Sequence, residues 1–339
     1  MVPSTWKSRL RMWFVISDVY VILSATEKVV VMTLPKRRPR PRPAIDLVFF
    51  RWTRPAPSGL RLETRRRAPV ETPSAITAET RWLVPTADGG TSYDPFGEEP
   101  SLFRLFAELP PTDDAATLAF AQKFGVLGIS ELSVVERDAV TRLLTTAVMA
   151  VEHYVPAESL DLWAREVRAM RHAVDVFDAL QGRNHETLAR WITVSPEGVV
   201  QYRREDALGS SQIGAGLPTG MKADGPTSAL MAVARHVLDE ELIKPRLRDY
   251  VSLFLIHAGR ERRSRLRAVP ANLLGALWLQ LARAVDGDIH YRRCAWRPCQ
   301  KWIEITRTFD GHTKAARFCS DAHRVYDYKK RHPKKRRKA

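Results

Sequence analysis

The sequence predicts an α+β protein: a predominantly helical globular domain with short β-hairpins, followed by a small zinc-binding module at the C-terminus. Three observations predict it. Several segments repeat apolar residues every three or four positions, as amphipathic helices do. Two short apolar segments flank the turn sequence Ser195–Gly198, which is typical of a hairpin. All three cysteines fall within the last 46 residues.

The length and the charge distribution of the chain indicate how many domains it forms and which kind of partner it binds. The 339 residues allow roughly two domains, and 45% hydrophobic with 27% charged residues is the composition of a folded globule. The formal net charge of +16 is uneven: residues 1–80 carry +9, residues 81–289 carry −5, and residues 290–339 carry 16 basic and 4 acidic side chains, a net +12. Segregated positive charge predicts a polyanionic partner, with nucleic acid ahead of an anionic membrane surface.

Cysteine usage and hydropathy predict a cytoplasmic protein that does not enter a membrane. Three cysteines cannot form a disulfide framework, and an odd number indicates a reducing compartment. The apolar run Met12–Leu23 contains Asp18 and is shorter than the ~20 residues that a membrane span needs. Translation from Met32 instead of Met1 stays open.

We expect residues 1–81 to form a basic, Pro/Arg-rich and largely disordered segment. Its centre, Pro35–Pro43, reads PKRRPRPRP, which suits neither a helix nor a sheet ladder. Between Ile45 and Thr80, short apolar runs alternate with arginine clusters, so we expect weak order with one strand.

Residues 82–289 are predicted to form the mainly helical α+β domain, which could also support a homodimer. No motif in it indicates which small molecule, if any, it binds. Good N-caps or apolar stripes mark its helices. They are predicted from Thr112 or Asp113 to Gly125, from the capping box at Ser133 to Val151, over 160–177, over 227–242, and from Asn272 to Val285. Strands are expected at 192–194 and 199–202, at 251–256 as a buried strand, and at 266–269.

The cysteines and one histidine form the pattern C-x4-C-x19-C-x3-H, made by Cys294, Cys299, Cys319 and His323. Two closely spaced ligand pairs on either side of a longer segment are typical of tetrahedral zinc, and thiolates with an imidazole suit zinc better than magnesium or calcium. Four protein ligands close the site, so we expect one structural Zn²⁺. His312 is the alternative fourth ligand.

Residues 290–331 are therefore predicted to form a zinc finger. Trp302, Ile303 and Ile305 indicate a short strand between the ligand pairs. A helix is expected from about Ser320 to Lys330, which places Cys319 and His323 four residues apart and on one face.

The motif resembles the C-terminal CGNR-type zinc finger, a module of treble-clef-like shape. The resemblance rests on Cys294 and Cys299, on Trp302-Ile303-Glu304, and on Arg317-Phe318-Cys319-Ser320 within residues 292–331. The layout is similar to that of bacterial ABATE-domain proteins, which are proposed to be transcription regulators. The CGNR string itself is absent: His323 takes the place of its cysteine and is followed by Arg324.

Basic residues surround the ligand pattern and continue into a tail, residues 332–339. A zinc-anchored helix with a basic face can lie against a duplex while a tail neutralises phosphates. We expect the following residues to contact nucleic acid, with duplex DNA as the expected form: Arg292, Arg293, Arg297, Lys301, Arg317, Arg324, Lys329, Lys330, Arg331, Lys334, Lys335, Arg336, Arg337 and Lys338.

No sequence motif indicates an enzyme. The chain has no phosphate-binding P-loop, no dinucleotide fingerprint, no nucleophile elbow and no HExxH. A zinc-bound nuclease would need a catalytic histidine beside the finger, and His312 lacks a partner. The sequence thus predicts a DNA-binding transcription regulator. The alternatives are a zinc-stapled protein-interaction or scaffold module and an RNA-binding protein.

Overall fold

The computed structural model contains two compact units, residues 1–46 and 47–339. It describes residues 14–16, 19–22, 30–32, 50–67, 79–86, 89–129, 131–135, 153–194, 200–203, 210–212, 226–257, 264–287, 289–299, 301–305 and 317–332. In the first unit, strands β1 (Phe14–Ile16), β2 (Val19–Ile22) and β3 (Val30–Met32) form an antiparallel sheet in that order. The tract Pro35–Pro43 lies outside the described residues.

The second unit begins with strands where disorder was expected. β4 (Trp52–Pro55) pairs with β7 (Gly90–Tyr93), and β5 (Leu60–Arg67) pairs with β6 (Glu79–Pro85) over seven residue pairs. β8 (Glu131–Val135) and β9 (His153–Ser159) close β5 and β6 into a small barrel in the order β5-β6-β9-β8. The expectation of a largely disordered segment 1–81 is wrong for these residues, because apolar side chains between the arginines, such as Leu60, are buried.

The predicted helix from Ser133 is corrected in the same region. Ser133 lies in strand β8 and pairs with Val155 of β9, so it does not cap a helix. The β-branched residues Val134 and Val135 suit a strand, and the ladder outweighs the local capping signal. The rest of that prediction, residues 136–151, lies outside the described residues.

Three helices follow β7. They are α1 (Pro95–Glu98), α2 (Leu102–Ala107) and α3 (Asp114–Phe124). Asp113 caps α3 by accepting a hydrogen bond from the N–H of Ala116, and α3 ends at Gly125, as the sequence predicted. Gly125 has φ +97°, a conformation that glycine adopts without strain.

Helix α5 (Leu160–Gln181) runs through the centre of the second unit. Its predicted apolar stripe is confirmed, because Trp163, Val167, Met170 and Phe177 are all buried. Helix α6 (His185–Ala189) follows, and β10 (Ile192–Val194), β11 (Val200–Arg203) and β12 (Ser210–Gln212) form an antiparallel sheet that contains the predicted hairpin.

The next helical segment is α7 (Pro226–His236), a π-helical stretch η1 (Val237–Ile243) and α8 (Lys244–Tyr250). Strands β13 (Val251–His257) and β14 (Ser264–Pro270) then pair as a two-stranded hairpin. The expectation that 251–256 is a buried strand is wrong: Leu253 and Phe254 are 65% and 51% exposed. A hairpin with no third strand among the described residues leaves much of β13 in solvent.

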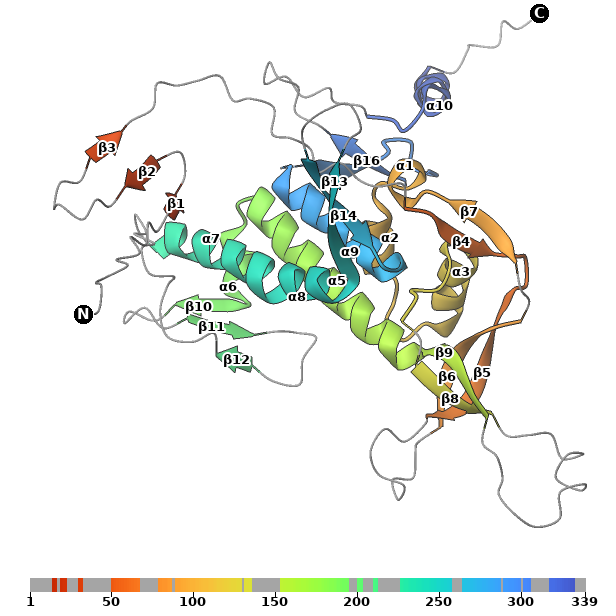
Figure 1. The fold of residues 1–339 in the computed structure, drawn as a ribbon. Coiled ribbons are helices and arrows are strands. Elements are labelled where there is room, and N and C mark those ends of the chain that lie inside the picture. Colours follow the sequence, from red (N-terminus) through yellow and green to blue (C-terminus); the bar gives the residue numbers. More distant parts are fainter. Residues whose placement is uncertain are drawn as a thin grey trace, which may run out of the picture. The chain divides into compact units, whose positions relative to one another are not determined.

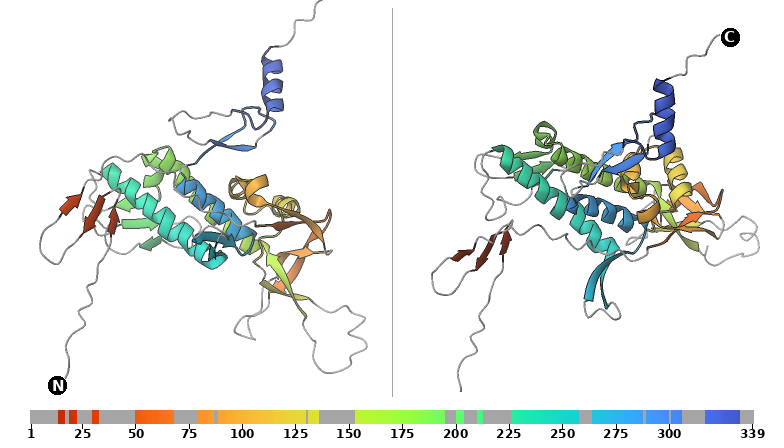
Figure 2. Two further views of the ribbon diagram at one scale, coloured as in Figure 1. Left: turned by 45° about the horizontal axis from the view of Figure 1, so that its top comes forward. Right: turned by 90° about the horizontal axis from the view of Figure 1, so that it is seen from above.

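Helix α9 (Leu273–Asp286) completes the core. Asn272 caps it through the N–H of Gly275, as predicted, and Leu274, Leu277 and Leu281 are fully buried. α5 packs against α7, η1 and α9, and Figures 1 and 2 show these helices side by side. The second unit is therefore a mixed helix-and-strand fold. None of the described helices is long and apolar enough to cross a bilayer.

Candidate metal centre

The first ligand pair lies at the turn of a β-hairpin. β15 (His290–Arg293) pairs with β16 (Trp302–Ile305), and Arg293 lies opposite Trp302 at the end of the ladder. Beyond this pair the N–H of Cys294 donates to the carbonyl of Lys301, at 2.8 Å, and the N–H of Cys299 donates to the carbonyl of Trp296, at 2.9 Å. These two bonds hold the turn that carries both cysteines. The predicted strand 302–305 is confirmed.

The second pair lies at the start of helix α10 (Asp321–Arg331). Ser320 caps this helix by accepting a hydrogen bond from the N–H of His323 at 3.3 Å. Cys319 precedes the cap and His323 lies in the first turn, so Cys319 Sγ and His323 Nδ1 are 3.0 Å apart. The backbone N–H of Ala295 donates to the carbonyl of Arg317 at 2.8 Å, which brings the two halves of the module together.

The four predicted ligands converge. Their donor atoms all lie within 4.8 Å of one another. Cys299 Sγ is 3.4 Å from Cys319 Sγ, and Cys294 Sγ is 3.7 Å from His323 Nδ1. Tetrahedral zinc holds sulfur and nitrogen ligands roughly 3.6–3.8 Å apart, so the donor set fits one metal ion. The cysteines are free thiols.

The surroundings shift the pKa values of Cys319 and Cys294 in opposite directions. Burial, together with the neighbouring thiols of Cys299 and Cys294, raises the pKa of the Cys319 thiol to about 11. Burial also acts to raise the pKa of Cys294, but backbone N–H groups of Cys319 and Trp296 donate toward its sulfur and bring its pKa below the usual range. Crowded thiols lose their protons most readily when a cation replaces them, which is how such a group takes up a metal.

A Cys3His group supplies four protein ligands, so a bound zinc would have no open position for water. This suits a structural metal that holds the hairpin and α10 together. The alternative ligand His312 lies outside the described residues.

Two of the predicted nucleic-acid residues face the helical domain. The guanidinium of Arg293 forms an ion pair with Glu108, the C-cap residue of α2, and Lys301 Nζ lies 3.7 Å from Glu99. The indole N–H of Trp302 also donates to Glu108, at 2.9 Å. These contacts fix the hairpin to the helical domain.

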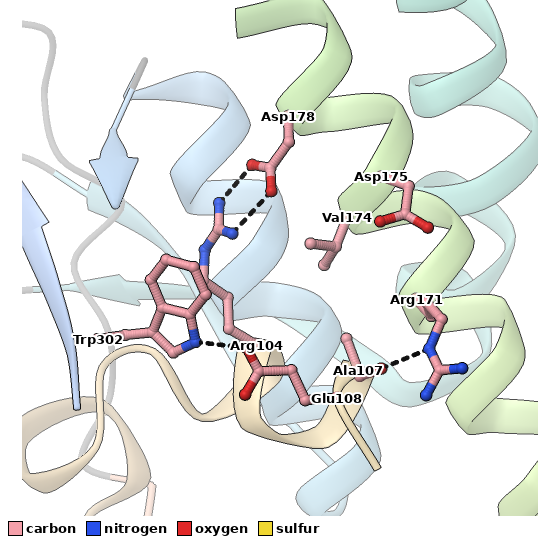
Figure 3. Close-up of a pocket in the computed structure, with 8 residues that line it drawn as sticks. All are labelled: Arg104, Ala107, Glu108, Arg171, Val174, Asp175, Asp178 and Trp302. Atoms are coloured by element: carbon pink, nitrogen blue, oxygen red, sulfur yellow. Dashed lines mark hydrogen bonds and ion pairs between the residues drawn. The ribbon is translucent and has the colours of Figure 1, made fainter. Parts of the chain in front are cut away.

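Arg104 of α2 is central to that contact, and sequence reasoning missed it. It is 3% exposed and forms a bidentate pair with Asp178 of α5, with distances of 2.6 and 2.9 Å. Its guanidinium carbon lies 4.7 Å from both the Tyr291 and the Trp302 ring centres. Figure 3 shows Arg104 beside the Trp302 indole. The one available signal was an arginine inside the apolar run Leu102-Phe-Arg-Leu-Phe106.

A cavity of about 270 Å³ adjoins this contact. Its lining combines the Trp302 side chain with residues of α2 and α5 (Figure 3): Arg104, Ala107, Glu108, Arg171, Val174, Asp175 and Asp178. The Arg171 guanidinium donates to the carbonyls of Ala107 and Leu109, at 2.8 and 2.5 Å. The two arginines of the lining therefore already use donors on the protein.

The remaining predicted basic residues are distributed around the module. Arg324, Lys329, Lys330 and Arg331 lie on α10, none of whose side chains is buried. Arg292 is on β15 and Arg297 in the turn between the cysteines, while Arg317 lies over the Phe318 ring at 5.9 Å. Residues 334–338 lie outside the described residues.

Comparison with known proteins gives no further assignment. No family model, no curated protein and no solved structure matches this chain. The resemblance to the CGNR-type finger therefore rests on the motif residues between 292 and 331, and the geometry of the Cys3His group supports their metal-binding part.

Proposed function

We propose that this chain is a nucleic-acid-binding protein, in the role of a DNA-binding transcription regulator, with one structural zinc in its C-terminal module. The observation that carries the proposal is the continuity between the Cys3His group and an exposed basic helix: His323 belongs to the group and is also a first-turn residue of α10. A hairpin whose turn carries two cysteines and a helix that follows a third would share one metal, the treble-clef-like arrangement to which we assign the module.

The electrostatics support a polyanion. α10 has no buried residue and carries the exposed side chains of Arg324, Lys329, Lys330 and Arg331, and the following residues 332–339 add five more lysines and arginines. Each contact to a phosphate releases condensed counterions, so affinity for nucleic acid should fall with salt. The zinc would hold α10 in one orientation, which turns diffuse charge into a defined surface.

A second function is favoured by a different observation. Arg293 and Lys301 are committed to Glu108 and Glu99 of the helical domain. A module docked in this way could serve as a zinc-stapled scaffold whose basic surface makes only non-specific contacts. The two functions differ in whether binding to nucleic acid requires the metal.

A salt titration of binding separates them. Full-length, zinc-loaded protein is titrated with random duplex DNA, single-stranded DNA and RNA at several ionic strengths, beside the Cys319→Ser variant. We expect affinity that falls with salt, and in Cys319→Ser a weaker affinity to which only the charge of the basic side chains contributes. A second variant, Lys330→Gln, should reduce the steepness of the plot of log affinity against log salt concentration by about one unit. Lys244→Gln, the same substitution on α8, is its control and should leave the slope unchanged.

Absence of salt-dependent affinity for every nucleic acid at low ionic strength would refute the proposed function and favour the scaffold. Equal affinity of the wild type and Cys319→Ser would keep nucleic-acid binding but remove the zinc-held helix from it.

A further inference from the structure

Three rings form a stack that starts at the metal group. The Trp296 ring lies 4.4 Å from the ring of the ligand His323, with an interplanar angle of 34°. Tyr326 also stacks on Trp296, at 5.6 Å and 29°. His323 and Tyr326 lie three residues apart on α10, and the rings of both contact the Trp296 ring.

Tyr326 is not needed to shield the Cys3His group from solvent. The Trp296 ring already packs against the His323 ring, and Trp296 is itself half-buried. Tyr326 is 53% exposed although it belongs to an ordered stack. A large ring that is held in place by its neighbours and remains half in solvent is a ready surface for another flat ring.

Two lysines accompany this ring. Lys329 and Lys330 follow Tyr326 by three and four residues, so they lie one turn further along the same face of α10. Both are exposed, and neither forms an ion pair among the described residues. The two arginines of α10 differ, because Arg324 pairs with Asp321 and Arg331 with Asp327. The face that carries Tyr326 thus offers two positive charges that have no ion-pair partner in the part of the chain that the structure describes.

We propose that Tyr326, backed by Trp296, is a stacking platform for an unpaired base, with Lys329 and Lys330 on the adjacent phosphates. Stacking on an aromatic side chain next to basic residues is the common means of binding single strands without sequence preference. In a closed duplex each base is stacked between its neighbours and offers no face to Tyr326. This inference rests on the proposed function and narrows its partner to nucleic acid with unpaired bases.

The test uses full-length, zinc-loaded protein and fluorescence anisotropy with a labelled oligothymidine and a duplex of equal length. Tyr326→Ala should weaken single-strand binding by at least about fivefold, the lower end for loss of one base–aromatic stack. Duplex binding should change by less than about twofold. The salt slope should not change, because no charge is removed. Tyr326→Phe keeps the ring and should retain the wild-type affinity.

The matched control is Tyr328→Ala, a more exposed tyrosine (64%) two residues away on the other side of the helix. It should leave the single-strand affinity unchanged. Zinc content is measured for each variant. If Tyr326→Ala loses zinc, then Tyr326→Leu, which keeps bulk over Trp296 but has no π-face, takes its place with the same expected loss.

The outcomes are distinct. Wild-type protein that binds no nucleic acid refutes the proposed function itself. Wild-type protein that binds, with Tyr326→Ala behaving like Tyr328→Ala or weakening duplex and single strand equally, overturns the stacking platform and leaves the proposed function standing.

Discussion

The guanidinium carbon of Arg104 lies 4.7 Å from the centre of the Trp302 indole ring. Arg104 belongs to α2 and Trp302 to the hairpin that carries Cys294 and Cys299 at its turn. The same guanidinium is paired with Asp178 of α5. One buried arginine therefore joins two core helices to the hairpin of the metal centre.

Replacing Arg104 should loosen this junction. Arg104→Met keeps most of the side-chain volume but removes the pair with Asp178 and the cation–π contacts. Asp178 is 47% exposed and can regain water, so we expect a loss of about 2–3 kcal/mol in the free energy of unfolding, less than for a fully buried pair. Urea unfolding of the zinc-loaded protein measures it.

Arg104→Lys provides a sharper comparison. Lysine keeps the charge but cannot form the planar bidentate pair or stack on the rings, so it should lose most of the same stability. Full retention of stability in Arg104→Lys would show that charge alone holds the hairpin to the helices.

Glu158 should be a second critical buried group. Its carboxylate accepts hydrogen bonds from the N–H groups of Leu127, Gly128 and Ile129 and from the indole of Trp163 at 2.8 Å. All four groups are donors. Glu158→Gln would aim an NH₂ group at donors and leave one or more unpaired, which costs about 1–3 kcal/mol for each. We expect a loss of about 2–4 kcal/mol in urea unfolding.

Glu186→Gln is the matched control, because Glu186 is exposed in the first turn of α6. It should change stability by less than about 0.5 kcal/mol. Similar stability of the two variants would mean that the donors around Glu158 find other acceptors.

Stability should fall at alkaline pH through Tyr93. Burial raises the pKa of Tyr93 well above its usual range, and its hydroxyl donates to the carbonyl of Phe124 at 2.7 Å. The folded protein keeps this proton where the unfolded chain loses it. The contribution to stability is thus complete below about pH 10 and is lost as pH rises further, by up to about 1.4 kcal/mol per pH unit.

Tyr93→Phe tests this directly. At neutral pH it should cost about 1 kcal/mol for the lost hydrogen bond, and above pH 10 its stability should fall less steeply than that of the wild type. Tyr328→Phe, a change at an exposed ring, should alter neither measure. Parallel alkaline profiles of wild type and Tyr93→Phe would exclude Tyr93 as the source.

Local patterns predicted the helices and the metal group well. The caps Asp113 and Asn272 were identified correctly, because a capping side chain bonds to a backbone N–H two or three residues away and the signal is local. The ligand spacing identified each of the two ligand pairs for the same reason, because the two members of a pair lie on one local turn.

Long-range pairing was not predictable in this way. Ser133 carries a capping-box signal, yet it lies in β8 because that strand pairs with β9 and β5. One strand was expected between Ile45 and Thr80, but the range contains β4, β5 and the start of β6, and arginines interrupt the apolar residues of β5. The contacts of Arg104 with Asp178 and of Arg293 with Glu108 join residues more than seventy positions apart, and no local pattern indicates them.

The basic tail should contribute equally to the affinity for nucleic acids of every sequence. Removing Lys334–Ala339 deletes five lysines and arginines, so the log–log salt slope should fall by at most about four to five units, at ~0.9 per neutralised phosphate. Affinity should decrease about equally for all sequences, because phosphates carry no sequence information. A loss confined to one sequence would instead give the tail a role in base recognition.

The central claim, that one zinc holds α10 in its binding orientation, is tested most directly by measuring single-strand affinity before chelation, after it, and after zinc is restored. Metal content is followed in the same full-length sample. We predict one zinc per chain, a loss of affinity of at least about tenfold when it is removed, and full recovery with zinc. Protein that is purified without metal and takes up none, or affinity that does not change on removing the zinc, would contradict the account.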